Sequence, residues 1–228
     1  MPVGIVTGAS RGLGLVLARE LAARGWRLVV DARGESALAQ AQGELARTTD
    51  VVALTGDVAD RAHLDALVEA AGERIDLVVN NASHLGPSPQ PELAEYPLEE
   101  LERVYRVNVL APLALFQLAL PRLAPGARIV NITSDAAVEP YPGWGGYGSA
   151  KAALEQLTAI LGAEHPELRV YAVDPGDMRT QMQQDAFPGE DISDRPPPEE
   201  SVPGLMILIE GALPSGRYHA RALAKVEA

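Results

Sequence analysis

The sequence predicts a doubly wound α/β fold, in which a parallel β-sheet lies between two layers of helices in a single domain. Short β-branched runs alternate with longer stretches of helical periodicity along most of the 228 residues, as expected of strand–helix–strand crossovers. Several of the short runs are apolar almost throughout, as strands covered on both faces should be. The first run leads directly into a glycine-rich turn, and a chain of this length buries a core large enough for one domain over residues 1–228.

Six runs of a few residues are predicted to be the strands. They are Val3–Thr7, Arg27–Asp31, Val51–Thr55, Leu77–Asn80, Arg128–Thr133 and Arg169–Val173. Five stretches with helical periodicity lie between them. They are Gly12–Arg24, Glu35–Arg47, Arg61–Ala71, Leu98–Leu123 and Tyr147–Glu164.

The last part of the chain follows a different pattern. Residues 181–203 are polar, acidic and proline-rich, and a loop of this length is typically either a substrate lid or a mobile surface segment. Both interpretations stay open at this point. The apolar run Leu205–Ile209 is expected to be a final helix or strand.

The amino-acid composition argues against several classes of binding partner. With 31 acidic against 19 basic residues the formal net charge is −12, which argues against binding to nucleic acid or to an anionic membrane. The absence of cysteine excludes disulfides, thiolate catalysis and cysteine-ligated metals, and four histidines without paired spacing predict no metal site. The N-terminal residues lack the pattern of a signal peptide, and the apolar stretch 107–120 is shorter than a bilayer span, so a cytoplasmic protein is expected.

The turn after the first strand has the composition of a phosphate-binding loop. Gly8, Gly12 and Gly14 are spaced Gly-x-x-x-Gly-x-Gly between a strand and an amphipathic helix. Glycines allow a tight turn and a close approach to a pyrophosphate, while the helix N-terminus supplies N–H donors and a favourable dipole. The position of the turn predicts a dinucleotide site, although any tight strand-to-helix turn also needs glycine.

The end of the second strand is expected to meet the adenosine ribose, and its residues leave two cofactors open. An acidic residue there binds the 2′-hydroxyl of NAD, whereas a cation favours the 2′-phosphate of NADP. Asp31 facing the ribose would select NAD, and Arg33 together with Arg11 would select NADP.

Three polar residues near the fifth strand form a candidate catalytic group. Tyr147 and Lys151 are four residues apart and therefore project from one helix face. An ammonium beside a phenol lowers the phenol's pKa from about 10 toward the working pH, as general acid–base catalysis on a carbonyl requires. Ser134, at the end of a strand, is placed to donate a hydrogen bond to the substrate oxygen. A Tyr-x-x-x-Lys pattern by itself usually marks only a helix face.

Together these motifs resemble those of the short-chain dehydrogenase/reductase family, whose members have a Rossmann fold. The resemblance rests on the TGASRGLG turn, Asp57-Val58, the Asn80-Asn81-Ala82-Ser83 strand end, Asn108 in a VNV context, Ser134, YGSAK, and the run from Pro175 to Thr180. It covers residues 3 to about 180 in the family's order and spacing.

The resemblance implies a role for each matching residue. Tyr147 would be the general acid in reduction, Ser134 would orient the carbonyl, and Lys151 would bind the nicotinamide ribose and lower the pKa of Tyr147. Asn108 would hold a water in a proton relay to Lys151. The residues implied to contact the cofactor, besides Tyr147 and Lys151, are Gly8, Ser10, Arg11, Gly12, Leu13, Gly14, Arg33, Asp57, Val58, Asn81, Ala82, Pro175, Gly176 and Thr180.

The family's register favours one of the two cofactors. Ala32 falls at the position that is acidic in NAD-preferring members, Arg33 takes the adjacent basic position, and Arg11 is the second cation. Asp31 then lies one residue too early to bind the ribose. We therefore expect NADP(H) rather than NAD(H).

Two features depart from the family's pattern. Ser83 replaces the usual glycine after Asn-Asn-Ala and is expected to tighten the turn beside the cofactor, with a small effect. The segment after Thr180 is short and unlike that of the family, so the resemblance does not predict the elements that complete the sheet and the substrate pocket.

The expected function is reversible hydride transfer between NADP(H) and a small carbonyl compound or secondary alcohol. A non-catalytic NADP-sensing protein and an isomerase or dehydratase on the same scaffold are the alternatives. In this family the helices equivalent to Leu98–Leu123 and Tyr147–Glu164 form a dimer interface, so a homodimer or homotetramer is expected.

Overall fold

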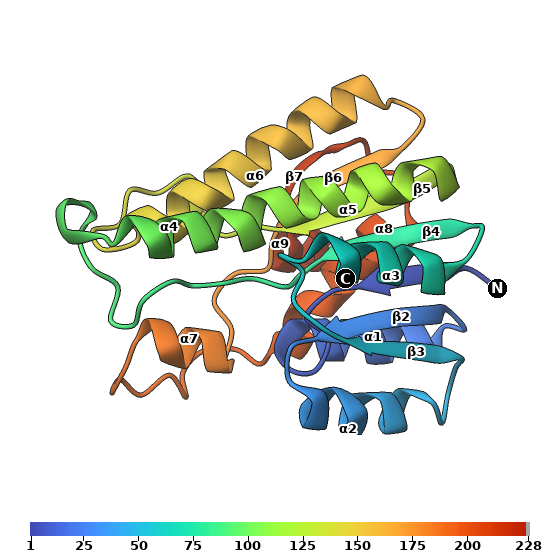
Figure 1. The fold of residues 1–228 in the computed structure, drawn as a ribbon, viewed down its shortest axis with the longest axis horizontal. Helices are drawn as coiled ribbons and strands as arrows, with labels where there is room; N and C mark the ends of the chain where they lie inside the picture. The colour runs from blue at the N-terminus through green and yellow to red at the C-terminus, as the bar shows by residue number, and fades with distance from the viewer. Residues whose placement is uncertain (227–228) are drawn as a thin grey trace.

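The structure, a computed structural model, describes residues 1–226 and contains one parallel sheet with the strand order β3-β2-β1-β4-β5-β6-β7 (Figure 1). The strands are β1 (Val3–Val6), β2 (Arg27–Ala32), β3 (Val51–Thr55), β4 (Ile75–Asn80), β5 (Leu123–Ile132), β6 (Arg169–Asp174) and β7 (Gly216–His219). The α-helices are α1 (Gly12–Ala23), α2 (Glu35–Leu45), α3 (Arg61–Ala71), α4 (Leu98–Tyr105), α5 (Ala111–Ala119), α6 (Gly145–Glu164), α7 (Gln181–Ala186), α8 (Val202–Glu210) and α9 (Ala220–Val226). The predicted doubly wound fold is confirmed; the last two residues of the predicted domain 1–228 lie outside the described residues.

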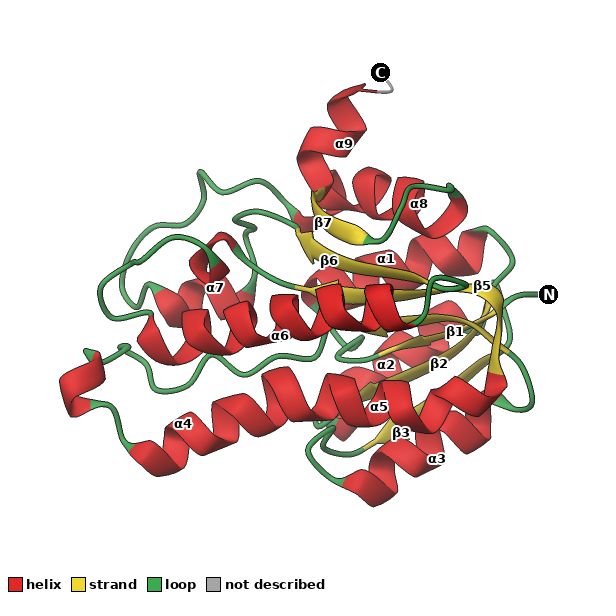
Figure 2. Cartoon of the chain, turned by 90° about the horizontal axis from the view of Figure 1, so that it is seen from above, coloured by secondary structure: helices red, strands yellow, loops and turns green. Residues whose placement is uncertain are grey.

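Alternate residues of each strand point to opposite faces of the sheet, and each face has its own apolar core. In β2, Leu28 and Val30 belong to one core, whereas Val29 belongs to the other. Helices α1, α2 and α8 complete the first core, and α3, α5 and α6 complete the second (Figure 2). Burial on both faces explains why these strands are apolar throughout.

The strand order reverses at β1, which pairs with β2 on one side and with β4 on the other. The chain leaves β1 toward α1 on one face of the sheet and leaves β4 toward α4 and α5 on the other face. In sheets of this kind the loops diverge at the reversal, so a ligand crevice forms at the carboxyl ends of the strands.

The stretch Leu98–Leu123, predicted as one helix, is interrupted. Helix α4 ends at Tyr105, a π-helical turn runs over Arg106–Leu110, and α5 follows. The π turn contains Asn108, which is only 1 % exposed. Residues Leu98–Arg122 are long and apolar enough to cross a membrane. Half of the most apolar part of this stretch, however, is buried within the fold.

The chain after residue 180 contains more regular structure than the sequence predicts. Residues 181–203 include α7 and a 3₁₀ turn at Pro198–Ser201. The apolar run 205–209, expected to be a helix or a strand, lies within helix α8. Strand β7 was not predicted, because its Gly-Arg-Tyr-His sequence has no apolar run. It forms an edge of the sheet beside β6 and leads into α9.

The contact between α8 and the start of α9 depends on Gly204. A Cβ at this position would lie 1.8 Å from the carbonyl oxygen of Ala220, a backbone atom that moves only if α9 or β7 moves. Gly204→Ala is therefore expected to destabilise the fold by about 1–3 kcal/mol, as overpacking usually does. The free energy of unfolding in urea measures this effect.

A second helical glycine provides the control. Gly43 lies on the exposed side of α2, where a Cβ would meet no atom within 4 Å. Gly43→Ala is expected to stabilise the protein by about 0.5–1 kcal/mol, because alanine favours a helix more than glycine does. Equal stability of Gly204→Ala and the natural protein would contradict the packing described here.

Candidate active site

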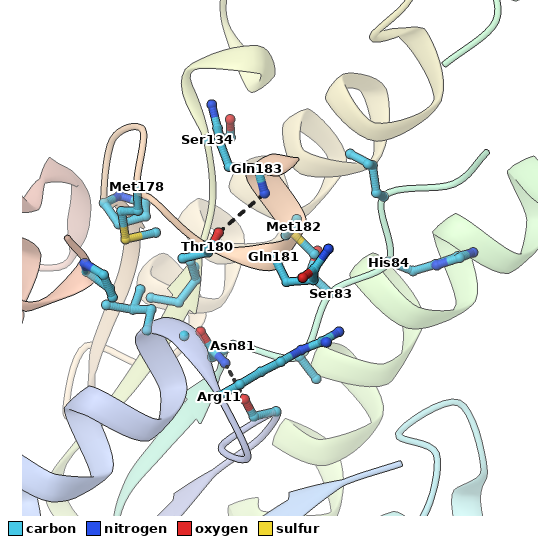
Figure 3. Close-up of a pocket in the computed structure, with 18 of the residues that line it drawn as sticks. Arg11, Asn81, Ser83, His84, Ser134, Met178, Thr180, Gln181, Met182 and Gln183 are labelled. Atoms are coloured by element: carbon cyan, nitrogen blue, oxygen red, sulfur yellow. Dashed lines mark hydrogen bonds between the residues drawn. The ribbon is translucent and has the colours of Figure 1, made fainter. Parts of the chain in front are cut away.

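A cavity of about 1030 Å³ runs along the carboxyl ends of the parallel strands (Figure 3). Its walls come from the loops that follow β1 to β6 and from α7. This volume is at the upper end of the usual range for ligand sites, as an extended ligand requires.

Most of the predicted site residues lie along this cavity. They are Gly8, Ser10, Arg11, Gly12, Leu13, Arg33, Asp57, Val58, Asn81, Ala82, Ser134, Tyr147, Lys151, Pro175, Gly176 and Thr180. Among the described residues, Gly14 and Asn108 lie behind the wall and support it. The fold therefore brings the predicted residues together, while their roles stay predictions.

The turn after β1 requires its glycines. Gly8 and Gly12 have φ angles of +67° and +55°, in the left-handed region. A Cβ at Gly14 would lie 2.5 Å from both the Asn81 side-chain nitrogen and the Gly8 carbonyl oxygen. Helix α1 begins at Gly12 on the cavity wall, so its positive dipole end favours an anion there. These features fit the pyrophosphate of a dinucleotide.

Thr7 joins this turn to the end of β4. Its hydroxyl oxygen accepts hydrogen bonds from the backbone N–H groups of Asn81 and Ala82, both at 3.0 Å. The Asn81 side chain donates in return to the carbonyl oxygens of Thr7 and Gly8, at 2.9 and 3.1 Å. Thr7 is not among the predicted site residues, although it opens the glycine-rich motif. Its hydrogen bonds fix the two loops relative to each other.

The carboxylate of Asp31, on the cavity wall, is bound by two partners. The residue is 1 % exposed; its Oδ1 accepts the Gly8 N–H at 2.7 Å, and its Oδ2 lies 2.9 Å from Nε2 of His63. Asp31 thus stabilises the glycine-rich turn. Arg11 and Arg33 are exposed and line the cavity.

Ser134, Tyr147 and Lys151 lie together at one end of the cavity. Ser134 follows β5, and the other two lie on the first turns of α6. Tyr147 and Lys151 are 7 % and 2 % exposed. Lys151 Nζ lies 5.4 Å from the centre of the Tyr147 ring and donates to the carbonyl oxygen of Ile132 at 2.8 Å.

Burial is the largest influence on the pKa values of Tyr147 and Lys151. Removal from water raises the pKa of Tyr147 to about 12, and the charges of Asp174 and Asp135 add to the rise. Burial lowers the pKa of Lys151 to about 7. Lys151 is not among the groups that lower the pKa of Tyr147 in this structure, because the lysine is itself desolvated and its nitrogen donates to a carbonyl; its effect on the phenol stays a prediction. Tyr147 is a protonated phenol at neutral pH.

Ser83 is the neighbour that favours the ionised form of Tyr147. Its hydroxyl lowers the pKa of Tyr147, which offsets part of the effect of burial. The same hydroxyl donates to Oδ1 of Asn108 at 3.2 Å. From the sequence we expected Ser83 only to tighten the turn; the structure adds a hydroxyl beside the candidate catalytic phenol.

Asn108 anchors the loop that carries Ser83. Its Oδ1 accepts the His84 N–H at 2.8 Å, and its Nδ2 donates to the His84 carbonyl oxygen at 2.9 Å. These bonds fix the loop after β4 against the π turn. The water relay from Asn108 to Lys151 stays a prediction.

The segment after β6 forms another wall of the cavity. The Thr180 hydroxyl caps α7 by accepting the Gln183 N–H at 3.3 Å (Figure 3). Met182 and Phe187, which belong to the predicted lid segment 181–203, line the cavity. Part of this segment is therefore a wall of the site.

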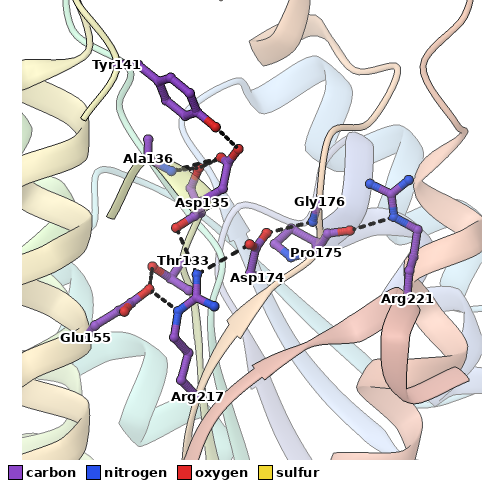
Figure 4. A network of polar contacts seen from close by, with 11 residues as sticks. Thr133, Asp135, Ala136, Tyr141, Glu155, Asp174, Pro175, Gly176, Arg217 and Arg221 are labelled. Carbon is purple, nitrogen blue, oxygen red and sulfur yellow. Dashed lines mark hydrogen bonds and ion pairs between the residues drawn. The ribbon is translucent and has the colours of Figure 1, made fainter. Parts of the chain in front are cut away.

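A polar network behind Ser134 joins β5, β6 and β7 (Figure 4). Arg217 of β7 donates to Glu155 at 2.9 Å, and the same carboxylate oxygen accepts the Thr133 hydroxyl at 2.7 Å. Arg217 also donates at 3.4 Å to the Ser134 carbonyl oxygen and to the Asp174 carboxylate. Arg217 is not among the predicted site residues, because β7 has no recognisable strand pattern.

Comparison with known proteins agrees with this fold and these motifs. The family model for short chain dehydrogenases matches residues 2–191. The benzil reductase of Saccharomyces cerevisiae that forms (S)-benzoin is 34% identical over 193 residues, which cover 79% of this chain and 73% of that protein. Sepiapterin reductase of Mus musculus is 36% identical over 200 residues, covering 80% and 76%. A short chain dehydrogenase from Shigella flexneri, solved in complex with NADP, is 27% identical with a TM-score of 0.87, covering 96% of this chain and 97% of that one.

Ser83→Ala is expected to raise the pKa of Tyr147 further, because the phenolate loses a hydrogen-bond donor. A hydrogen bond of about 0.5–1.5 kcal/mol corresponds to a rise of roughly 0.4–1 pH unit. Alcohol oxidation needs the phenolate, so its rate should begin to rise at a higher pH in the variant. The measurement is kcat/KM for alcohol oxidation as a function of pH.

Ser149→Ala is the control for this experiment. Ser149 is exposed on the same helix, and its hydroxyl donates to the Gly146 carbonyl oxygen. Its pH profile should match that of the natural protein. A profile of Ser83→Ala that is unchanged, or shifted to lower pH, would show that Ser83 does not stabilise the phenolate.

Proposed function

The chain belongs to the short-chain dehydrogenase family, and we propose that it is an NADP(H)-dependent oxidoreductase that interconverts a small ketone and the corresponding secondary alcohol. One observation carries the proposal: the buried phenol of Tyr147 lies on the same cavity as the Ser134 hydroxyl and the glycine-rich start of α1. A proton donor, an oxygen-binding group and a pyrophosphate site thus share one space.

The cavity has the parts that a nicotinamide dinucleotide needs. The turn from Gly8 to Gly12 and the N-terminus of α1 would hold the pyrophosphate, and Asp57 and Val58 lie on the wall proposed to contact the adenine. Members of this family use nicotinamide cofactors, which supply or accept the hydride when bound.

Three features support NADP(H) over NAD(H). The carboxylate of Asp31 already binds the turn and His63, so it is not placed to select the 2′-hydroxyl of NAD. Arg33 and Arg11 are exposed on the cavity wall and suit a 2′-phosphate. The similar protein from Shigella flexneri was solved with NADP.

Tyr147 would act as the proton donor in reduction. Since its pKa is raised to about 12, the phenol carries its proton at neutral pH and gives it to the carbonyl oxygen as that oxygen gains charge. Ser134, whose hydroxyl donates to Asp135 in this structure, would turn that hydroxyl to the same oxygen and orient the carbonyl. Lys151 would bind the nicotinamide ribose, and segment 181–203 would cover the substrate.

Assembly and location are proposals that rest on surface composition. Leu98, Leu110 and Leu120 are exposed along α4, α5 and the turns at their ends, and Ile160 is exposed on α6. Apolar side chains on these helices support a homodimer or homotetramer joined through them. A cytoplasmic location stays a proposal.

Tyr147→Phe is expected to lower kcat for ketone reduction by about 10²–10⁴-fold, because only the acidic hydroxyl is removed. Cofactor affinity should stay close to that of the natural protein. Turnover is followed by the absorbance of the reduced nicotinamide, and cofactor binding by fluorescence titration.

The control is Tyr105→Phe on α4, which should leave turnover unchanged. Undiminished turnover in Tyr147→Phe would contradict the catalytic assignment. A natural protein that binds NADPH but oxidises it with no member of a broad carbonyl panel would favour the sensing alternative. Tightly retained cofactor without net redox would favour the isomerase or dehydratase alternative.

Arg33→Ala tests the choice of cofactor. Loss of a charge-assisted contact to the 2′-phosphate is expected to weaken NADPH binding by about 10- to 100-fold and to leave NADH binding almost unchanged. The two dissociation constants are measured by fluorescence titration. Arg47→Ala, on the exposed surface after α2, should change neither. Preference of the natural protein for NADH would overturn the proposal for NADP(H).

A further inference from the structure

The end of the cavity beyond Tyr147 has a wall of flat rings. Trp144 packs edge-on against Tyr147 with ring centres 5.9 Å apart, and its ring lies 5.8 Å from that of Phe187. Leu85 and Ala186 belong to the same apolar cluster as Trp144. All five side chains line the cavity, so this end suits a substrate with a flat apolar ring.

The same end carries the carboxylate of Asp135, next to the hydroxyl of Ser134. Oδ1 of Asp135 accepts the Ser134 hydroxyl at 2.9 Å and the Ala136 N–H at 2.8 Å. Its Oδ2 accepts the Tyr141 hydroxyl at 3.1 Å (Figure 4). These bonds hold the carboxylate in place, while Asp135 itself is exposed and lines the cavity.

No cation of the described residues neutralises this carboxylate. Within residues 1–226 Asp135 forms no ion pair. Arg217 is paired with carboxylates of α6 and β6, and Lys151 donates to a backbone carbonyl. The charge of Asp135 also reaches the phenol, where it helps to raise the pKa of Tyr147. This end of the cavity therefore favours a positive group on the ligand.

We propose that the substrate is an aryl ketone that carries a protonated amine close to the reacting carbonyl, with Asp135 binding the ammonium while Ser134 binds the carbonyl oxygen. This inference rests on the proposed function. The 2.9 Å between Asp135 Oδ1 and the Ser134 hydroxyl places the ammonium within a few bonds of the carbonyl. The aryl ring lies against Trp144 and Phe187, whose π faces also attract a nearby cation. A carboxylate in the position of the ammonium is repelled by Asp135.

Three ketones of similar size test the proposal. Phenacylamine, propiophenone and benzoylacetate share one phenyl ketone and carry an ammonium, a methyl or a carboxylate at the same position. Their kcat/KM values with NADPH are compared below about pH 7, where an α-amino group is protonated. The natural protein should prefer phenacylamine to propiophenone by about two- to fivefold, the usual effect of a partly exposed ion pair, and should reduce benzoylacetate least.

Asp135→Asn removes the charge and keeps the shape and an oxygen that accepts the Ser134 hydroxyl. The measurement is the ratio of kcat/KM for phenacylamine to kcat/KM for propiophenone. An effect transmitted through Ser134 changes both values alike, so it cancels in the ratio. The ratio should fall toward one in Asp135→Asn. The control is Glu139→Gln, an exposed carboxylate in the same loop that does not line the cavity; its ratio should match the natural protein.

An unchanged ratio in Asp135→Asn, or a natural preference for propiophenone or benzoylacetate, would overturn the proposal. Reduction of propiophenone separates this failure from failure of the proposed function, because propiophenone needs no contact with Asp135. If none of the three ketones is reduced, calorimetric titration with phenacylamine remains decisive. Binding that is several-fold weaker in Asp135→Asn than in the natural protein supports the site, and equal binding overturns it.

Discussion

The hydrogen bonds of Thr7 connect the ends of β1 and β4, and the two halves of the site depend on that connection. On one side the Asn81 side chain donates to the carbonyl oxygens of Thr7 and Gly8 and so fixes the glycine-rich turn before α1. On the other the Thr7 hydroxyl fixes the chain at Asn81 and Ala82, from which the loop continues to Ser83. The spacing between the candidate pyrophosphate site and the loop that carries Ser83 is therefore set at the reversal of strand order, where neighbouring loops diverge.

The chemistry of the site depends on a balance between burial and a few polar contacts. Burial holds Tyr147 in its protonated form and makes Lys151 a weaker base than a lysine in water. Ser83 acts against burial, while the carboxylates of Asp135 and Asp174 act with it. Tyr147 therefore carries its proton at neutral pH, as a proton donor must, while the negative charge around it disfavours the phenolate that remains after donation.

Sequence patterns predict the parts of this protein that depend on neighbours along the chain. Apolar runs and helical periodicity identify β1 to β6 and the crossovers between them, and four-residue spacing predicts that Tyr147 and Lys151 share a helix face. The direction in which Lys151 points, the contact of Ser83 with the phenol and the reach of Arg217 to Ser134 involve residues distant in the chain. A single sequence carries no signal for such contacts, and the roles of the site residues remain predictions.

Strand β7 is four residues long and borders the sheet on one side only, yet its Arg217 reaches the backbone of Ser134 and the Asp174 carboxylate. Short edge strands open locally at a lower free energy than the central strands of a sheet. Fraying at this edge would release the Ser134 loop while the core around β1 stays folded. Thermal inactivation would then be a subglobal event, complete before the far-ultraviolet circular dichroism of the protein changes.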